Sequence, residues 1–494
     1  MPPGILTNAV SLSAETPELS PADTGFMLIA TAMVMVMTPA LAFFYGGMVR
    51  VKSVLNMLMM SFISLGLVTV LWVLYGFSLA FGTDHGSVIG FSGDYVGLSG
   101  IGLTELWDGY TIPVYVFAAF QLMFAILTPA LISGALADRV KFTAWALFVV
   151  LWATIVYFPV AHWVWGAGGW LFELGVIDFA GGTAVHINAG AAALGVIFVV
   201  GKRIGFKKDP MRPHSLPLVM LGAGLLWFGW FGFNAGSWLG NGDGVGAVAF
   251  LNTQVATGAA MLGWLAYEKL RHGSFTTLGA ASGAVAGLVA ITPACGSVSP
   301  LGAIAIGVIA GVLCAMAVGL KYKFGYDDSL DVVGVHLVGG VVGSLLIGFF
   351  ATGGVQSKAQ GLFYGGGLAQ LGKQSVGVVS VLLYSLVVSF VLAKVIDLVM
   401  GFRVSEDEEL AGVDQAAHAE TAYDYGGTGG GSALARTAAA APASASGGDA
   451  SASGADGDTA GGTDGGSASA SASQTGSSAQ AQGGTPGKAK KVDA

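Results

Sequence analysis

The chain has little charge and little cysteine. Only 10% of its 494 residues are charged and 54% are hydrophobic, whereas a soluble domain has about 25% charged residues. Both cysteines, Cys295 and Cys314, stand in apolar surroundings, so they indicate neither a disulfide framework nor a zinc site. The net charge of −8 argues against a nucleic-acid partner. The low fraction of charged residues excludes an ordinary soluble domain.

Long apolar runs take the place of the missing charge. Runs of about 20 residues, the length that crosses a bilayer, recur through the first 400 residues. We predict an all-α polytopic membrane protein with eleven transmembrane helices, at residues 25–47, 54–81, 112–137, 142–161, 183–200, 216–239, 250–270, 275–292, 300–320, 334–352 and 376–400.

Basic residues gather in alternate loops, at residues 50–52, 139–141, 202–212, 269–271 and 321–323. The intervening loops are mostly acidic, with Lys358 and Lys373 as their only basic residues. Because Lys and Arg favour the cytoplasmic side, this asymmetry predicts an N-terminus outside the cell. An odd number of spans then leaves the C-terminus inside.

Composition divides the chain into four regions. Residues 1–22 lack Lys and Arg and have no separate apolar run, so we expect an extracellular segment rather than a cleaved signal peptide. Residues 23–400 form the transmembrane domain, and residues 401–425 form an acidic cytoplasmic tail. Residues 426–494 are almost wholly Gly, Ala, Ser, Thr and Asp, a composition that predicts disorder.

The predicted spans contain a repeat. The fifth span begins within DFAGGTAVHIN (178–188), and the tenth begins within DVVGVH (331–336). Thr-Pro-Ala occurs in the third span (128–130) and again in the eighth (292–294). Five spans per repeat is an odd number, so the halves must have opposite topology: a 5+5 inverted repeat plus one helix.

Each repeat places a carboxylate and an imidazole at the start of a membrane helix. Aligning His186 with His336 also aligns Ala189-Gly190 with Gly339-Gly340. A satisfied capping aspartate and a core histidine explain either motif alone. The pair favours a shared site, because ionisable groups within membrane spans are costly and usually functional.

Aromatic residues point to a path for a cation. Phe120 and Phe124 lie four apart on the third span, and Trp165 follows the fourth. The sixth span adds Trp230, Phe233 and Ser237. Aromatic faces attract ammonium-type cations by about 0.5–2 kcal/mol, and a hydroxyl adds an acceptor. The alternative for each aromatic residue is lipid contact or the interfacial belt.

Several motifs together resemble the ammonium transporters of the Amt/Mep/Rh superfamily, over roughly residues 20–425. They are FFYGG (43–47), AHWVWG (161–166), DFAGGTAVHINAG (178–190) with GKR (201–203), GWFGFNAGS (229–237), ITPACG (291–296) and GVH (334–336). The combination of Trp165 with Ser237 favours the Amt branch. The resemblance implies a homotrimer of eleven-helix subunits, each with its own pore. It also implies a location in the plasma membrane, with membrane lipids as partners.

The resemblance also implies roles for single residues. It implies an outer ammonium site of Trp165, Phe124 and Ser237, and a gate of Phe124 and Phe233 with Phe120 beside it. It implies that His186 and His336 line the pore and that Trp230 forms part of the pore wall. It implies a structural or proton-relaying role for Asp178. In the second half we predict Asp331 as the counterpart of Asp178. The 401–425 segment resembles the family's regulatory tail, which implies a PII-type signal protein as partner.

Ammonium and ammonia are the expected substrates. An apolar pore strongly disfavours a bare cation, and ammonium escapes that cost by losing a proton, which potassium cannot do. We therefore expect electrogenic movement of ammonia plus a separate proton. A passive ammonia channel and an ammonium sensor-transporter remain alternatives that would use the same residues.

No enzyme and no cofactor is predicted. A membrane hydrolase using His186 and Asp178 would need a nucleophile motif, and none is evident. A metal site at His186 and His336 would need further soft ligands.

Overall fold

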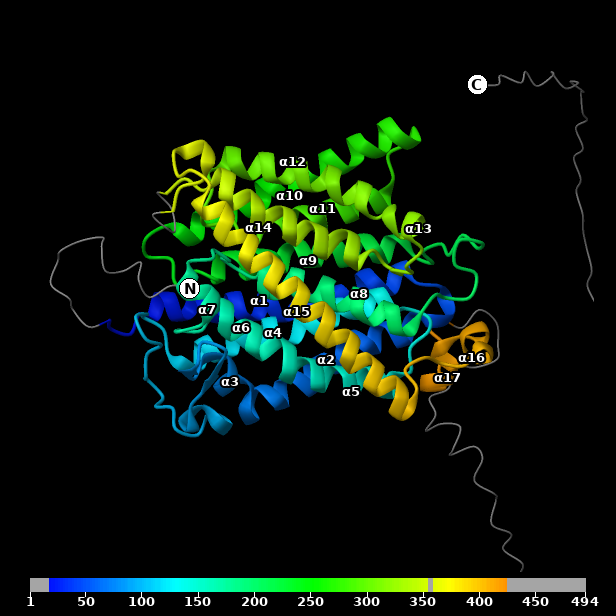
Figure 1. The fold of residues 1–494 in the computed structure, drawn as a ribbon, viewed down its shortest axis with the longest axis horizontal. Coiled ribbons are helices and arrows are strands. Elements are labelled where there is room, and N and C mark those ends of the chain that lie inside the picture. Colours follow the sequence, from blue (N-terminus) through cyan, green and yellow to red (C-terminus); the bar gives the residue numbers. More distant parts are fainter. Residues whose placement is uncertain (1–16, 354–358, 424–494) are drawn as a thin grey trace, which may run out of the picture. The chain divides into compact units, whose positions relative to one another are not determined.

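The computed structural model describes residues 17–353 and 359–423 (Figure 1). Within this part of the chain, ten helices are long and apolar enough to cross a membrane, which confirms the all-α polytopic fold. A further, shorter apolar helix, α11 (Thr277–Ile291), occupies the eighth predicted span, residues 275–292. Its 15 residues rise about 22 Å against a hydrocarbon core of about 30 Å, so the count of eleven stays a prediction. The predicted disorder of residues 426–494 lies outside the described residues.

The first half of the chain contains five spans. Its elements are α1 (Pro21–Met48), α2 (Val54–Leu71), α3 (Phe77–Phe81), β1 (Thr83–His85), β2 (Ile89–Phe91), α4 (Val114–Ser133), α5 (Phe142–Trp152), α6 (Phe158–Trp165), α7 (Trp170–Leu174) and α8 (Asn188–Val200). Short 3₁₀ turns lie at Val51–Ser53, Gly93–Leu98 and Gly134–Leu136. The fourth span runs through α6, so Trp165 is the last residue of that helix and does not follow it as predicted.

The second half repeats this arrangement. Its elements are α9 (Leu216–Gly236), α10 (Val245–His272), α11, α12 (Pro300–Ala317), α13 (Leu320–Phe324), α14 (Val338–Phe350), a 3₁₀ turn at Leu362–Tyr364, α15 (Ala369–Met400), α16 (Glu406–Ala411) and α17 (Val413–His418). Ser20, Ser215 and Ser299 cap α1, α9 and α12, each with a proline in the first two helical positions. This is the expected start of a helix, because the hydroxyl accepts from a free N–H and proline needs none there.

Both histidine motifs adopt π-helical turns. Gly182–Ile187 leads into α8, and Val333–Leu337 leads into α14. Two further π turns, Trp72–Gly76 and Ala153–Tyr157, join α2 to α3 and α5 to α6. A π turn frees backbone groups from the regular ladder and is common at functional sites.

The two halves meet as an inverted repeat should. The first helices of the halves, α1 and α9, pack side by side, and each histidine turn contacts the helix that follows the other. Two glycines make this crossing possible. A Cβ on Gly190 would lie 2.5 Å from the backbone nitrogen of Leu337, and one on Gly340 would lie 2.9 Å from the side chain of Ile187. The glycines are four residues after His186 and His336, so the close approach brings the histidines together.

The eleventh predicted span, α15, runs obliquely across both halves in Figure 1 and contacts α8, α14 and α5. It begins at Ala369, seven residues before the predicted start. The early part escaped prediction because it contains Gln370 and Gln374, which are polar but buried.

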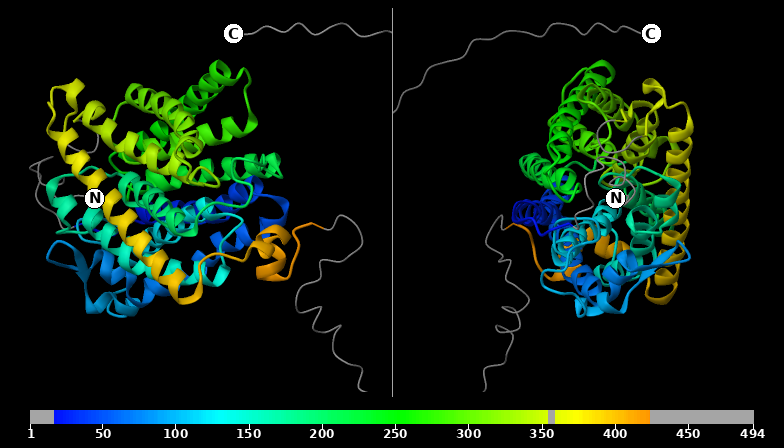
Figure 2. Two further views of the ribbon diagram at one scale, coloured as in Figure 1. Left: turned by 45° about the vertical axis from the view of Figure 1, so that its right-hand side comes forward. Right: turned by 90° about the vertical axis from the view of Figure 1, so that its left-hand side faces the viewer.

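One end of the helix bundle carries a β-hairpin, and the other carries the tail helices α16 and α17 (Figure 2). At the hairpin end, β1 pairs antiparallel with β2, with Asp84 opposite Gly90. At the tail end, α16 and α17 lie against the loops between the helices. Asp414 of α17 accepts hydrogen bonds from the backbone N–H groups of Leu55 and Asn56, at the start of α2. The tail therefore caps a transmembrane helix of its own chain.

Buried charges hold the tail end together. Arg203 donates to both carboxylate oxygens of Asp327, at 2.8 and 2.9 Å, and the neighbouring Arg139 is fully buried. Burial alone would raise the pKa of Asp327, but the hydrogen bond from Arg203 and the charge of Arg139 hold it below its ordinary value. This ionised network fixes the loops after α8 and α13, which flank the central histidines.

Candidate functional site

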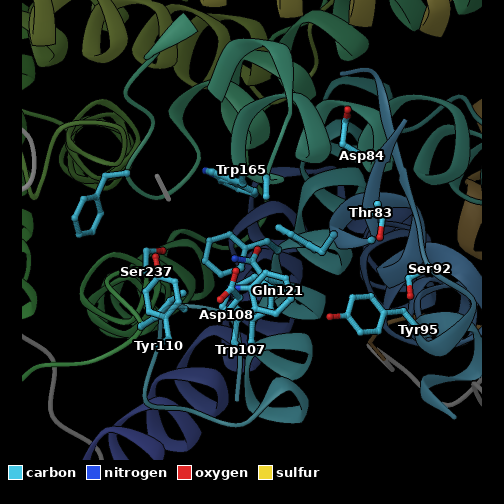
Figure 3. A pocket seen from close by; sticks show the side chains of 17 residues that line it. Thr83, Asp84, Ser92, Tyr95, Trp107, Asp108, Tyr110, Gln121, Trp165 and Ser237 are labelled. Atoms are coloured by element: carbon cyan, nitrogen blue, oxygen red, sulfur yellow. The ribbon is translucent and has the colours of Figure 1, made fainter. Parts of the chain in front are cut away.

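A cavity of about 360 Å³ opens at the hairpin end (Figure 3). Its lining brings together the three residues predicted for an outer site, Trp165, Phe124 and Ser237. The rings of Trp165 and Phe124 meet edge to face, with centroids 5.9 Å apart. Figure 3 shows Asp84 of the hairpin on the opposite side of the space from Ser237. We call this cavity the vestibule.

Two polar groups of the vestibule have their donors engaged within the chain. The indole N–H of Trp165 donates to the Asp178 carbonyl at 3.0 Å, so this donor is not available to a molecule in the cavity. The hydroxyl of Ser237 donates to the Phe233 carbonyl at 2.8 Å, which leaves its lone pairs free. Aromatic faces and free lone pairs suit a cation that carries N–H donors.

Asp84 adds a negative charge. Its Oδ1 lies 2.9 Å from Nε2 of the buried His162, whose Nδ1 lies 3.0 Å from the Ala80 carbonyl. A carbonyl only accepts, so Nδ1 carries a proton. The hydrogen bond with His162 holds the pKa of Asp84 below its ordinary value, so this carboxylate stays ionised at neutral pH.

Next to the vestibule, two phenylalanines pack against each other. The rings of Phe124 and Phe233 lie 4.3 Å apart at 38°, and both side chains are buried. Phe120 packs on Phe124 at 4.9 Å and is also buried. The three residues predicted to form a gate are therefore packed together and buried.

The two predicted pore histidines touch directly beneath this aromatic pair. Nδ1 of His186 lies 3.3 Å from Nδ1 of His336, and the rings are nearly parallel at 17°. Trp230 stacks on His186 with centroids 5.3 Å apart, and its N–H donates to the Thr292 hydroxyl at 2.8 Å. The repeated Thr-Pro-Ala motif thus orients the tryptophan that lies against the histidine pair.

Tyr45, which the sequence did not reveal as a site residue, lies next to the histidine pair. The hydroxyl of Tyr45 lies 3.5 Å from Nε2 of His336 and donates to the Leu131 carbonyl at 3.1 Å. Nε2 of His186, the other histidine of the pair, has no hydrogen-bond partner among the described residues. The tyrosine belongs to the FFYGG motif, which was the signal that could have found it.

Asp178 faces the backbone and not the vestibule. Its two carboxylate oxygens accept from four consecutive N–H groups, those of residues 181 to 184, at 2.6–2.9 Å. These groups begin the π turn that carries His186. Because the Asp178 carbonyl also holds Trp165, one residue fixes both the vestibule wall and the histidine.

The counterpart of Asp178 in the second half is Asp328, eight residues before its histidine, rather than Asp331. Asp328 accepts from the N–H groups of Val332 and Val333 at 3.0 and 2.8 Å. Asp331 instead forms an ion pair with Lys321 at 2.5 Å and has a left-handed backbone, φ 65°.

This placement predicts unequal effects for two neighbouring substitutions. Asp328→Asn should lower the stability of the protein by about 1–3 kcal/mol, because buried N–H groups lose a charged acceptor, and should reduce transport. Asp331→Asn should cost less than about 1 kcal/mol, since its ion pair is partly exposed and asparagine tolerates positive φ. Thermal unfolding in detergent measures both; a larger loss for Asp331→Asn would contradict the assignment.

Gln374 is a further positioning residue that the sequence did not reveal. Its Oε1 accepts from the N–H of Ile177 at 2.7 Å, and its Nε2 donates to the carbonyl of the same residue at 2.8 Å. The eleventh span thereby holds the residue next to Asp178. A buried amide within an otherwise apolar span was the available signal.

The fold and the site define a multi-pass membrane protein with a vestibule of aromatic and polar side chains, a buried pair of phenylalanines and two buried histidines in contact. The chain belongs to the Ammonium Transporter Family, whose profile matches residues 25–423. It is 57% identical over 431 residues to an ammonium transporter of Mycobacterium tuberculosis, covering 82% of this chain and 90% of that one. With an ammonium transporter of Bacillus subtilis it shares 48% over 405 residues, covering 81% and 98%.

A solved structure described as a Sensor Amt Protein has the same fold. Its TM-score with this chain is 0.74 at 30% sequence identity, covering 80% of this chain and 98% of the other. Together with the sequence relatives, this likeness supports ammonium transport as the activity of the chain.

Proposed function

We propose that the chain moves ammonium electrogenically, by separating it into ammonia and a proton. The vestibule binds the cation, the closed aromatic pair excludes it, and ammonia passes while the proton follows the histidine pair. The observation that carries this proposal is the direct contact of His186 with His336 beneath Phe124 and Phe233.

The hydrogen bonds assign the tautomers of that pair. The Tyr45 hydroxyl donates a hydrogen bond to the Leu131 carbonyl, so its oxygen accepts a hydrogen bond from Nε2–H of His336. Nδ1 of His336 then accepts from Nδ1–H of His186, which leaves Nε2 of His186 as an unpaired acceptor. That lone pair can accept a proton or a hydrogen bond from an N–H of ammonia.

Selectivity for ammonium over potassium follows from the burial of the aromatic rings through which the substrate must pass. A cation between buried aromatic rings loses its hydration without an adequate replacement, which is strongly unfavourable. Ammonium avoids this cost by giving up its proton at the vestibule. Potassium has no proton to give, so it is excluded even though aromatic faces attract it as well.

We propose that the hairpin end faces the outside and the tail end faces the cytoplasm of the cell. The clustering of Lys and Arg in the tail-end loops supports this orientation. Regulation at the tail end, with a PII-type partner on a homotrimer, is also proposed. The docking of residues 401–423 on the loops around Lys52, Arg139 and Ile204 supports it, because these contacts link the tail to the helix ends.

The outer-site residues predict a loss of apparent affinity. Trp165→Ala together with Ser237→Ala should raise the ammonium concentration for half-maximal transport roughly 5- to 30-fold, since a desolvated cation–π contact is worth about 1–2 kcal/mol. The maximal rate should change less, because the histidine pair is intact. Uptake at micromolar and millimolar ammonium measures this; unchanged uptake at micromolar substrate would remove both residues from the site.

The tail predicts a difference between two deletions. Removing residues 426–494 should leave transport unchanged, because that composition offers no apolar anchor. Removing residues 403–494 also deletes Asp414, which caps α2, and should change the rate or its control. Loss of transport in the shorter deletion would contradict this division of the tail.

A sensing role is the second candidate, favoured by the likeness to the Sensor Amt Protein structure. Growth of a transporter-deficient cell on limiting ammonium separates a transporter, with or without a sensing role, from a sensor that does not transport. A sensor that does not transport would leave such a cell unable to grow.

A further inference from the structure

A second large cavity, about 660 Å³ in volume, opens at the tail end. Its walls come from the loop that follows α8, from α13 and from the loop before α14. Among its lining residues are five cationic side chains and two carboxylates: Arg203, Lys207, Lys208, Arg212 and Lys321, with Asp209 and Asp331. We call it the basic cavity.

Two of the five cations are already neutralised within the chain. Arg203 is paired with Asp327, and Lys321 is paired with Asp331. The exposed side chains of Lys207, Lys208 and Arg212 form no ion pair with any residue that the structure describes. Three uncommitted cations therefore face one cavity that holds a single uncommitted carboxylate, that of Asp209. Such a surplus of charge favours an anionic occupant.

We propose that the basic cavity binds an anion that carries phosphate groups. Lysine ammonium and arginine guanidinium groups are the usual donors to phosphate oxygens. The volume falls within the roughly 300–1,000 Å³ of small-molecule sites. Phe206 and Tyr322, which also line the cavity, stack with centroids 5.9 Å apart and give it a flat aromatic wall.

The position of the basic cavity gives binding a consequence for transport. Met48, Leu330 and Asp331 line both this cavity and a small space of about 10 Å³ next to Tyr45 and His336. The basic cavity is therefore the tail-end mouth of the path that passes the histidines. Three free positive charges at that mouth oppose a cation there, and a bound anion would offset them.

The shared chemistry could come from a soluble phosphate compound or from a lipid headgroup, because basic residues at a membrane surface also bind anionic lipids. The first arm of the test uses inorganic pyrophosphate and the purified full-length chain in detergent, followed by titration calorimetry at constant ionic strength. We expect saturable binding that weakens at least about tenfold in Lys208→Glu/Arg212→Glu, since each charged contact contributes about that factor or more.

A matched control makes this result specific to the cavity. Lys269→Glu/Arg271→Glu changes the net charge equally, at exposed residues near the end of α10 that do not line the cavity. This control should bind pyrophosphate like the parent chain. Should the reversal variant unfold on heating at a lower temperature than the control, Lys208→Ala/Arg212→Ala replaces it.

The second arm reconstitutes the same variants in nanodiscs with phosphatidylglycerol or with phosphatidylcholine alone and counts retained lipid by native mass spectrometry. Pyrophosphate binding that only the cavity variant loses identifies a soluble phosphate compound. Phosphatidylglycerol retention that only the cavity variant loses, without pyrophosphate binding, identifies a headgroup. Equal behaviour of the cavity and control variants toward both probes would overturn the proposal.

Discussion

His186→Ala combined with His336→Ala should lower the ammonium-evoked current roughly 100-fold or more, a typical contribution of positioned proton-transfer groups. In the parent chain the two Nδ1 atoms lie 3.3 Å apart in a buried pair. Alanine at both positions removes every polar atom of that pair, so a proton would have to cross between the aromatic rings and Tyr45 without support. The current across a supported membrane that contains the purified variant measures the effect.

The control for this experiment is His272→Ala, which removes an exposed histidine at the end of α10. Its current should equal that of the parent chain, and both variants should match the parent in size on gel filtration. A parent-like current in the double variant would show that the histidines are core residues and that the proton travels elsewhere.

Asp178→Asn should have the second largest effect, combining loss of transport with a loss of stability of about 2–4 kcal/mol. Four buried N–H groups lose a charged acceptor, and the amide NH₂ would face donors that it cannot satisfy. The same change disturbs the loop that holds both Trp165 and His186. Transport and thermal unfolding in detergent should therefore fall together.

Asp397→Asn serves as the matched control for this substitution. Asp397 also accepts a backbone N–H, that of Phe402, but it is partly exposed and pairs with Lys394 on the surface of α15. It should keep near-parent stability and current. An Asp178→Asn variant that behaves like this control would show that the carboxylate does not organise the site.

Much of the architecture was predictable because its signals are local. A long apolar run predicts a membrane span, so the predicted positions agree with the helices to within a few residues for most spans. The meeting of His186 with His336 was also predictable, since an inverted repeat places equivalent residues about one axis. Glycines four residues after each histidine, already visible in the alignment, permit that contact.

What the sequence did not reveal depends on backbone geometry and tertiary contact. The motif DVVGVH drew attention to Asp331, but the π turn starts so that Asp328 reaches its free N–H groups. The start of α15 was missed because Gln374 is polar, and only the folded chain shows its amide paired with the backbone of Ile177. Hydrophobic periodicity cannot detect a polar residue that another loop satisfies.

In the proposed mechanism, charge crosses the membrane with each ammonia molecule. The most direct test is the current recorded from the purified chain in a supported membrane, when ammonium is added at constant pH and ionic strength. We expect a transient current with ammonium and none with an equal concentration of potassium. Ammonia flux without a current would contradict it and would identify the chain as a passive channel.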